Sequence, residues 1–179
     1  EYIQRKGFRI GPKAVQLLAD HLGSDLGKIV GELRKLFINL KKGEEITQEI
    51  IERNVGISKD FNIFEYQDAL GVKDHLKAYQ IAGYFADNPK SNPVFKVTAS
   101  LSGYFSKILL YHAQKDKTPA NVASALGINP FFVKGYAVAA RNYPEQKILK
   151  IFSWLREYDV KSKGVDNETT PSGELIKEM

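Results

Sequence analysis

The sequence of 179 residues has no cysteine, and it has only one methionine and one tryptophan. Without cysteine the chain can form neither a disulfide nor a thiolate metal site, which is compatible with a reducing compartment. No apolar run approaches the roughly 20 residues of a membrane-spanning helix. The first residues, Glu1 to Lys6, also lack the apolar stretch of a secretory signal. We therefore expect a cytoplasmic protein with no membrane partner, and the start at a glutamate suggests part of a longer polypeptide.

A strong charge of one sign is also missing. The 26 lysine and arginine residues exceed the 21 aspartate and glutamate residues by five, divided as +2 in residues 1–57 and +3 in residues 58–179. A dedicated phosphate-binding face would concentrate its cations in one region. The even spread favours a mixed, solvated surface, and the hydrophobic content of 43% is sufficient for a folded core.

Apolar residues recur at steps of three and four from Lys13 onward, without a sustained two-residue alternation. This period predicts an all-α protein of roughly nine helices and no other regular structure. Three of them are expected in the first third, delimited by Gly23, Ser24, Thr47 and Gly56. The expected buried stripes are Val15, Leu18 and Leu22 in the first helix and Leu26, Ile29, Val30, Leu33, Leu36, Phe37 and Leu40 in the second.

Three short amphipathic helices joined by small turns can close on themselves, so residues 1–57 are predicted to form a compact bundle. Residues 58–179 then form a second domain of about six helices. Asn62 and Glu65 fit a capping box at its first helix, which Gly71 is expected to end. Prolines mark several later helix ends, and the buried stripe of residues 74–86 is expected to be Leu76, Tyr79, Ala82 and Phe85.

The sequence contains no recognisable catalytic or cofactor motif. The histidines His21, His75 and His112 have no partner at a metal-binding helical step, and no glycine-rich phosphate loop precedes a lysine. Glu65 and Asp68 could form a carboxylate pair, but this spacing is typical of an exposed helical face. We therefore expect a non-catalytic protein without a metal or cofactor, and an enzyme using this pair is a minor alternative.

Residues 118–141 have the pattern of a helix-turn-helix, in which two short helices are joined by the sequence GINP. Its expected core is Ala123, Leu126, Ile128 and Val133. The second helix begins with Pro-Phe-Phe, which offers no hydrogen-bond donors to base edges. A DNA-reading motif and an ordinary helical hairpin are both open, and Lys134 and Arg141 are the candidate residues near DNA.

The second domain is rich in aromatic residues, more than a helical core is expected to enclose. Exposed aromatic side chains favour protein interfaces. The candidate interface residues are Tyr104, Phe105, Tyr111, Phe131, Phe132 and Trp154.

Several segments together resemble the delta subunit of bacterial DNA polymerase III, a clamp-loader family. The resemblance begins with GSDLGKIVGELRKL at residues 23–36 and continues through the Ile46-Thr47 pair and the stretch NIFEYQDAL at residues 62–70. Later matches are Lys77-Ala78, Pro119, Val122-Ala123, Leu126-Gly127-Ile128 and Tyr158-Asp159-Lys161. Their order and spacing extend over nearly the whole chain.

This resemblance implies that residues 1–57 are the helical lid of an AAA+ module and residues 58–179 a helical collar domain. The implied function is a non-catalytic scaffold in the hetero-pentameric clamp loader, which opens the sliding clamp and loads it onto DNA during replication. The other clamp-loader subunits are the implied partners, whereas the clamp would bind an N-terminal domain outside this chain and DNA would be contacted through the complex. A free-standing helix-turn-helix DNA-binding protein is the alternative.

Overall fold

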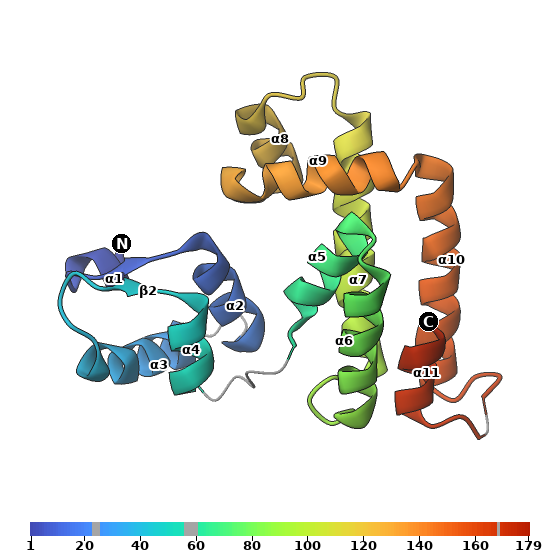
Figure 1. The fold of residues 1–179 in the computed structure, drawn as a ribbon, viewed down its shortest axis with the longest axis horizontal. Coiled ribbons are helices and arrows are strands. Elements are labelled where there is room, and N and C mark those ends of the chain that lie inside the picture. Colours follow the sequence, from blue (N-terminus) through green and yellow to red (C-terminus); the bar gives the residue numbers. More distant parts are fainter. Residues whose placement is uncertain (23–25, 56–60, 168) are drawn as a thin grey trace. The chain divides into compact units, whose positions relative to one another are not determined.

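A computed structural model of the chain describes residues 1–22, 26–55, 61–167 and 169–179 (Figure 1). Within these ranges it has eleven α-helices, one 3-10 helix and two strands of two residues each, so the predicted all-α class is confirmed. The chain divides into two compact units, residues 1–60 and 61–179. The predicted boundary after residue 57 and the predicted helix ends at Gly23, Ser24 and Gly56 lie outside the described residues.

The first unit contains two short strands that the sequence pattern did not indicate. Its elements are α1 Tyr2–Arg5, β1 Arg9–Ile10, α2 Pro12–Leu22, α3 Leu26–Asn39, β2 Glu45–Ile46 and α4 Gln48–Val55. The strands are parallel and pair Arg9 with Glu45 and Ile10 with Ile46. A two-residue strand is too short to show the alternation that identifies a strand in sequence. The expectation of helices alone was therefore wrong at this pair.

The core of the first unit uses partly different residues from those predicted. α2 buries Ala14, Leu17 and Leu18, whereas the side chain of Val15 is 48% exposed. The buried face of α2 is thus rotated from the predicted one, although Leu18 is buried as predicted. In α3, Leu33 and Leu36 are buried as predicted, but Leu26 is 75% exposed.

The second unit begins with α5 and contains the longer helices. Its elements are α5 Ile63–Val72, α6 His75–Asp87, α7 Val94–Ala113, α8 Pro119–Leu126, the 3-10 helix η1 Pro130–Phe132, α9 Val133–Asn142, α10 Glu145–Ser162 and α11 Ser172–Glu178. α10 runs beside α7, α11 packs on α6, and α5 packs between α6 and α9 (Figure 1).

Helix ends in this unit follow local sequence signals at most positions. The Asn62 side chain accepts hydrogen bonds from the N–H groups of Phe64 (3.0 Å) and Glu65 (3.1 Å), which confirms the predicted cap. The predicted stop at Gly71 was wrong, because α5 continues to Val72 and ends at Lys73, which has a φ of 60°. Gly71 has a packing role instead, since a Cβ atom there would meet the hydroxyl of Tyr104.

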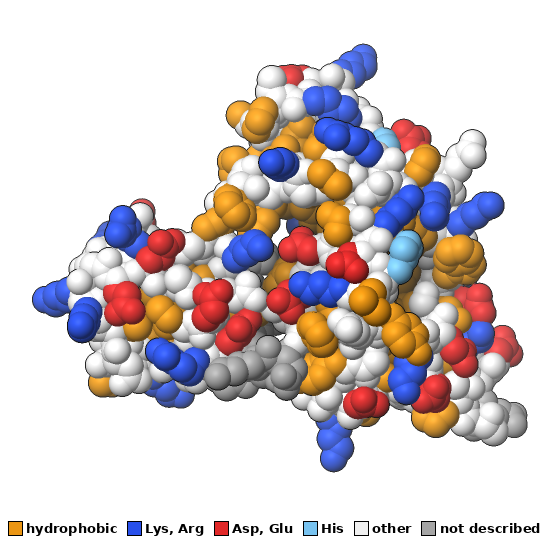
Figure 2. Space-filling view, viewed as in Figure 1, with side chains coloured by type: hydrophobic (Ala, Val, Ile, Leu, Met, Phe, Trp, Pro, Cys, Tyr) orange, Lys and Arg blue, Asp and Glu red, His pale blue; other side chains and the backbone are white. Residues whose placement is uncertain are grey.

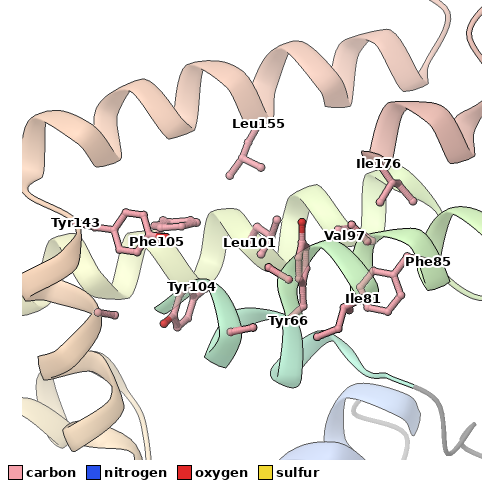
Figure 3. Close-up of a cluster of buried hydrophobic side chains, with 14 of the residues drawn as sticks. Tyr66, Ile81, Phe85, Val97, Leu101, Tyr104, Phe105, Tyr143, Leu155 and Ile176 are labelled. Carbon is pink, nitrogen blue, oxygen red and sulfur yellow. The ribbon is translucent and has the colours of Figure 1, made fainter. Parts of the chain in front are cut away.

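The core of the second unit lies between α5, α6, α7, α10 and α11 (Figure 3). Its largest fully buried side chains include Phe85, Ile81 and Ile148. On α6 the predicted stripe was only half correct: Ala82 and Phe85 are buried, whereas Leu76 is 72% and Tyr79 is 69% exposed. Both faces of α6 carry apolar residues, so periodicity alone did not determine which face meets the core.

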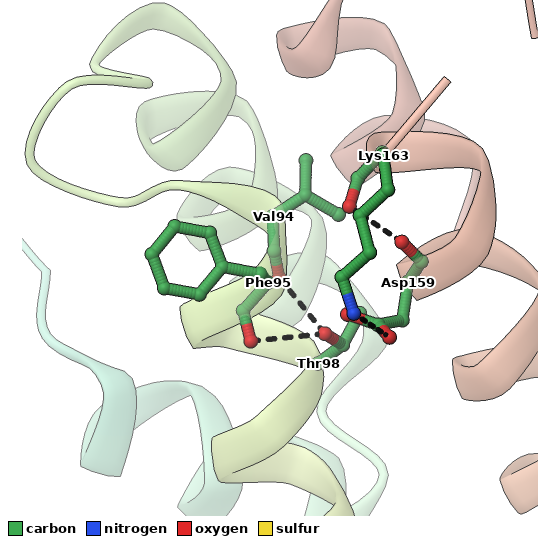
Figure 4. A network of polar contacts seen from close by, with 6 residues as sticks. Val94, Phe95, Thr98, Asp159 and Lys163 are labelled. Carbon is green, nitrogen blue, oxygen red and sulfur yellow. Dashed lines mark hydrogen bonds and ion pairs between the residues drawn. The ribbon is translucent and has the colours of Figure 1, made fainter. Parts of the chain in front are cut away.

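Among the described residues, the polar side chain of Thr98 is buried beside the apolar core. Its hydroxyl donates to the backbone carbonyls of Val94 and Phe95, both at 3.1 Å, within α7 (Figure 4). Nearby, Asp159 in the last turn of α10 forms an ion pair of 2.7 Å with Lys163, the residue that follows the helix. Both interactions are local, so they satisfy polar groups at the start of α7 and at the end of α10.

Burial of Tyr66 predicts a loss of stability at alkaline pH. Desolvation, with a smaller contribution from Tyr143, raises the pKa of Tyr66 from 10.0 to about 12. The unfolded state therefore loses this proton first, and stability that is complete below pH 10 falls as the pH rises toward 12. One unit of pH in this range costs about 1.4 kcal/mol per tyrosine.

The measurement is urea unfolding of the wild type and of Tyr66→Phe at pH 9 and pH 11. The variant keeps the ring, which packs edge-on against Phe85 at 5.7 Å, and removes the titrating hydroxyl. We expect the wild type to lose about 1 kcal/mol more than the variant between these pH values. An equal loss of unfolding free energy in both proteins would contradict a raised pKa of Tyr66.

Candidate subunit interface

The helix-turn-helix predicted at residues 118–141 is present as a hairpin of α8, η1 and α9. The pair Pro119–Leu126 and Pro130–Asn142 is bent by 107°. Gly127 ends α8 with a φ of 61°, and Asn129 accepts a hydrogen bond from the N–H of Phe131 at 2.9 Å. The hairpin core is Val122, Ala123, Leu126 and Val133, with Ile128 partly buried against it. The predicted core residues are therefore confirmed.

The turn of this hairpin carries exposed aromatic surface. Phe131 is 60% exposed, Phe132 is partly buried, and their rings meet edge to face at 5.2 Å. Lys134 and Arg141 are both exposed on α9. Their spacing of seven residues places them on one helical face, about 10 Å apart along the axis. The turn therefore presents an apolar surface, and the two cations lie further along α9.

The remaining predicted interface aromatics differ in exposure. Trp154 on α10 is 52% exposed, and Tyr111 is partly buried beneath the ammonium group of Lys117, 4.3 Å from the ring centre. Tyr104 and Phe105 are 7% and 3% exposed and belong to the core of the unit. The assumption that these two rings are exposed was therefore wrong, because they lie on the side of α7 that faces α5, α9 and α10.

A hydrogen-bonded junction holds the corner between α9 and α10 against the end of α5. The Tyr143 hydroxyl donates to the Leu70 carbonyl at 2.7 Å, and the Asn142 side chain donates to the Gly71 carbonyl at 2.8 Å. The His112 ring nitrogen Nε2 lies 2.9 Å from the Tyr143 carbonyl. Pro144 is one of the prolines that mark a helix end in the sequence, whereas these long-range bonds have no local signal.

In the parts of the chain that the structure describes, no three histidine, aspartate or glutamate side chains are grouped to hold a metal ion. No single described helix is long and apolar enough to cross a membrane, although the bent pair of α8 and α9 meets the length and composition requirement jointly.

Glu65 and Asp68, the possible carboxylate pair, both lie on α5. Burial, with a smaller contribution from the charge of Asp68, raises the pKa of Tyr136 to about 12.

Comparison with known proteins relates the chain to a replication family. Residues 60–176 match the family model described as the DNA polymerase III delta subunit, C-terminal domain. DNA polymerase III subunit delta of Bacillus subtilis (strain 168) is 30% identical over 158 residues, which is 86% of this chain and 44% of that protein. The solved Bacillus subtilis DNA clamp loader delta protein is similar with a TM-score of 0.60 and 27% identity, over 98% of this chain and 51% of that chain. The chain thus spans about half the length of these relatives.

Proposed function

This chain belongs to the family of DNA polymerase III delta subunits, and we propose that it acts as a non-catalytic scaffold in a clamp loader. In this proposal the second unit is the collar domain that holds the subunit among the other subunits of a hetero-pentamer. The first unit is the helical lid of an AAA+ module. The sliding clamp and DNA are reached through the rest of the complex, in the cytoplasm.

The observation that carries this proposal is that the family match and the second compact unit begin and end at nearly the same residues. The family match covers residues 60–176, and the second compact unit covers residues 61–179. A compact unit that matches a family domain over nearly its whole length has the core of that domain, and therefore its fold. The names of the two Bacillus subtilis relatives, a polymerase subunit and a clamp loader protein, support the same complex.

Among the predicted interface residues, Phe131 and Trp154 are the exposed candidates for subunit contact. Their exposed fractions of 60% and 52% leave a large aromatic surface available to a partner. Tryptophan and other aromatic residues are enriched at the centres of protein interfaces. Phe132 and Tyr111, both partly buried, would contribute smaller areas.

One observation favours the alternative of a free-standing DNA-binding protein. The bend of 107° between the helices of the hairpin lies in the range of helix-turn-helix motifs. The second helix, however, starts at Pro130 and Phe131, which cannot donate hydrogen bonds from their side chains to base edges. Contact through Lys134 and Arg141 would be mostly to phosphates and independent of sequence.

Size-exclusion chromatography with light scattering tests the proposal. The chain is mixed with the other clamp-loader subunits of its own organism, and we expect it to co-elute with them in a complex of defined mass. Elution of the folded chain at its own mass would contradict the scaffold function. A mobility-shift assay distinguishes the alternative: tight, sequence-dependent binding of duplex DNA by the isolated chain would support it.

A further inference from the structure

Helix α6 has two apolar faces, and the second unit covers only one of them. Ile81 and Phe85 are fully buried, whereas Leu76 is 72% and Tyr79 is 69% exposed on the opposite side of the helix. Val72, at the end of α5, is 58% exposed. Figure 2 shows hydrophobic side chains gathered over α6 on the face in view. A helix that is apolar on both sides is typically covered on both sides.

Val72, Leu76 and Tyr79 form an exposed apolar row. Three lysines lie where the end of α5 meets the start of α10. The Lys73 and Lys147 ammonium groups lie over the same Tyr143 ring, at 5.7 Å and 5.6 Å from its centre. Lys150 follows one turn later on α10, and all three lysines are exposed. Among the described residues no ion pair joins any of them to a carboxylate. Figure 2 shows cationic side chains gathered near the start of α10.

The backbone at Lys73 adds to this pattern. Its φ of 60° lies in the left-handed region, where glycine is the favoured residue at a helix end. A lysine there costs stability relative to glycine, yet it places a second ammonium group on the Tyr143 ring. Two cations therefore lie at one ring, where a carboxylate of a partner could pair with either of them.

We propose that these residues form the docking surface for an amphipathic helix of a neighbouring clamp-loader subunit, with an apolar stripe bordered by carboxylates. The surface consists of Val72, Lys73, Leu76, Tyr79, Lys147 and Lys150. This inference rests on the proposed scaffold function and specifies the chemistry of the partner.

The chemistry of the apolar row favours a protein over a nucleic acid. Single-stranded nucleic acid binds by stacking its bases on aromatic rings along a cationic groove. The aliphatic side chains of Val72 and Leu76 cannot stack on bases. A helix with apolar residues at steps of three and four would cover Leu76 and Tyr79, and its flanking carboxylates would pair with the lysines.

Two surface variants and two matched controls test the proposal. Leu76→Ala/Tyr79→Ala removes the apolar row, and Phe95→Ala is its control because Phe95 is also exposed, at 58%, but lies at the start of α7. Lys147→Glu/Lys150→Glu reverses two charges, and its control is Lys96→Glu. Lys96 is the third residue of α7 as Lys147 is of α10, so both substitutions place glutamate favourably in a first helical turn.

Affinity of the full chain for the neighbouring subunits is measured by titration calorimetry at low and high salt. We expect each surface variant to weaken binding about tenfold at low salt, and each control to remain within about twofold. The deficit of the charge variant shrinks at high salt, whereas that of the apolar variant persists. Thermal melting establishes that all four proteins remain folded.

Three other outcomes of these binding experiments would overturn the proposal. If the surface variants and controls bind equally well, the docking surface is wrong and the scaffold function stands. If the wild-type chain does not associate, the scaffold function fails and this inference fails with it. Binding of a single-stranded oligonucleotide by the chain alone, lost in Lys147→Glu/Lys150→Glu, would assign the surface to nucleic acid and overturn the proposal.

Discussion

Replacing Phe85 with alanine is expected to lower the free energy of unfolding of the second unit by about 3–5 kcal/mol. The Phe85 side chain is fully buried between α6 and the helices that cover it, close to Tyr66 (Figure 3). Its ring centre lies 5.7 Å from that of Tyr66 and 6.2 Å from that of Tyr84. Truncation leaves a cavity that close-packed neighbours fill only in part.

The test is urea unfolding followed by circular dichroism, with Phe95→Ala as the matched control. Phe95 has the same side chain but is 58% exposed, so its removal should cost less than about 1 kcal/mol. Similar midpoints for the two variants would show that Phe85 does not hold the core. If the proposed scaffold function holds, Phe85→Ala should also associate less with partner subunits, because a partly unfolded second unit cannot present its surface.

The second large effect is expected at Gly173, where α11 approaches α6. A Cβ atom at this position would lie 2.5 Å from the carbonyl oxygen of Ala86, a backbone atom that cannot rotate away. Gly173→Ala must therefore push α11 off α6 and expose part of Leu175 and Ile176, which are 2% and 1% exposed. We expect a loss of about 1–3 kcal/mol despite the better helix propensity of alanine.

Gly103→Ala is the matched control for this substitution. Gly103 is exposed within α7, and an added Cβ atom there meets nothing within 4 Å. Alanine should stabilise this helix by up to about 1 kcal/mol because it restricts the unfolded chain. Opposite signs for the two glycine variants, measured as changes in the urea midpoint, would support the close approach of α11. A stabilised Gly173→Ala protein would contradict it.

The helix boundaries of the second unit were largely predictable because their signals are local. Prolines at positions 119, 130 and 144 mark helix starts, and Asn62 caps α5 through its own side chain. Such signals depend on a residue and its nearest neighbours in sequence. The stop predicted at Gly71 failed because this glycine makes room for Tyr104, a residue 33 positions away in the chain.

Contacts between distant residues explain the errors in the candidate site. Tyr104 and Phe105 were expected to be exposed, and they are buried because α5, α9 and α10 meet α7 on their side. Leu76 and Tyr79 were expected in the core and are exposed. In both cases the residue types are suitable for either place, so composition did not decide between them.

The sequence by itself determined the all-α class, most helix ends in the second unit and the resemblance to the delta subunit family. These depend on turn residues, on a period of three to four and on ordered motifs, all of which are properties of the linear chain. Only the tertiary structure decided which face of α6 meets the core and which aromatic rings remain exposed. It also brought Lys73 and Lys147 onto one Tyr143 ring, because side chains 74 residues apart meet only after the helices have packed.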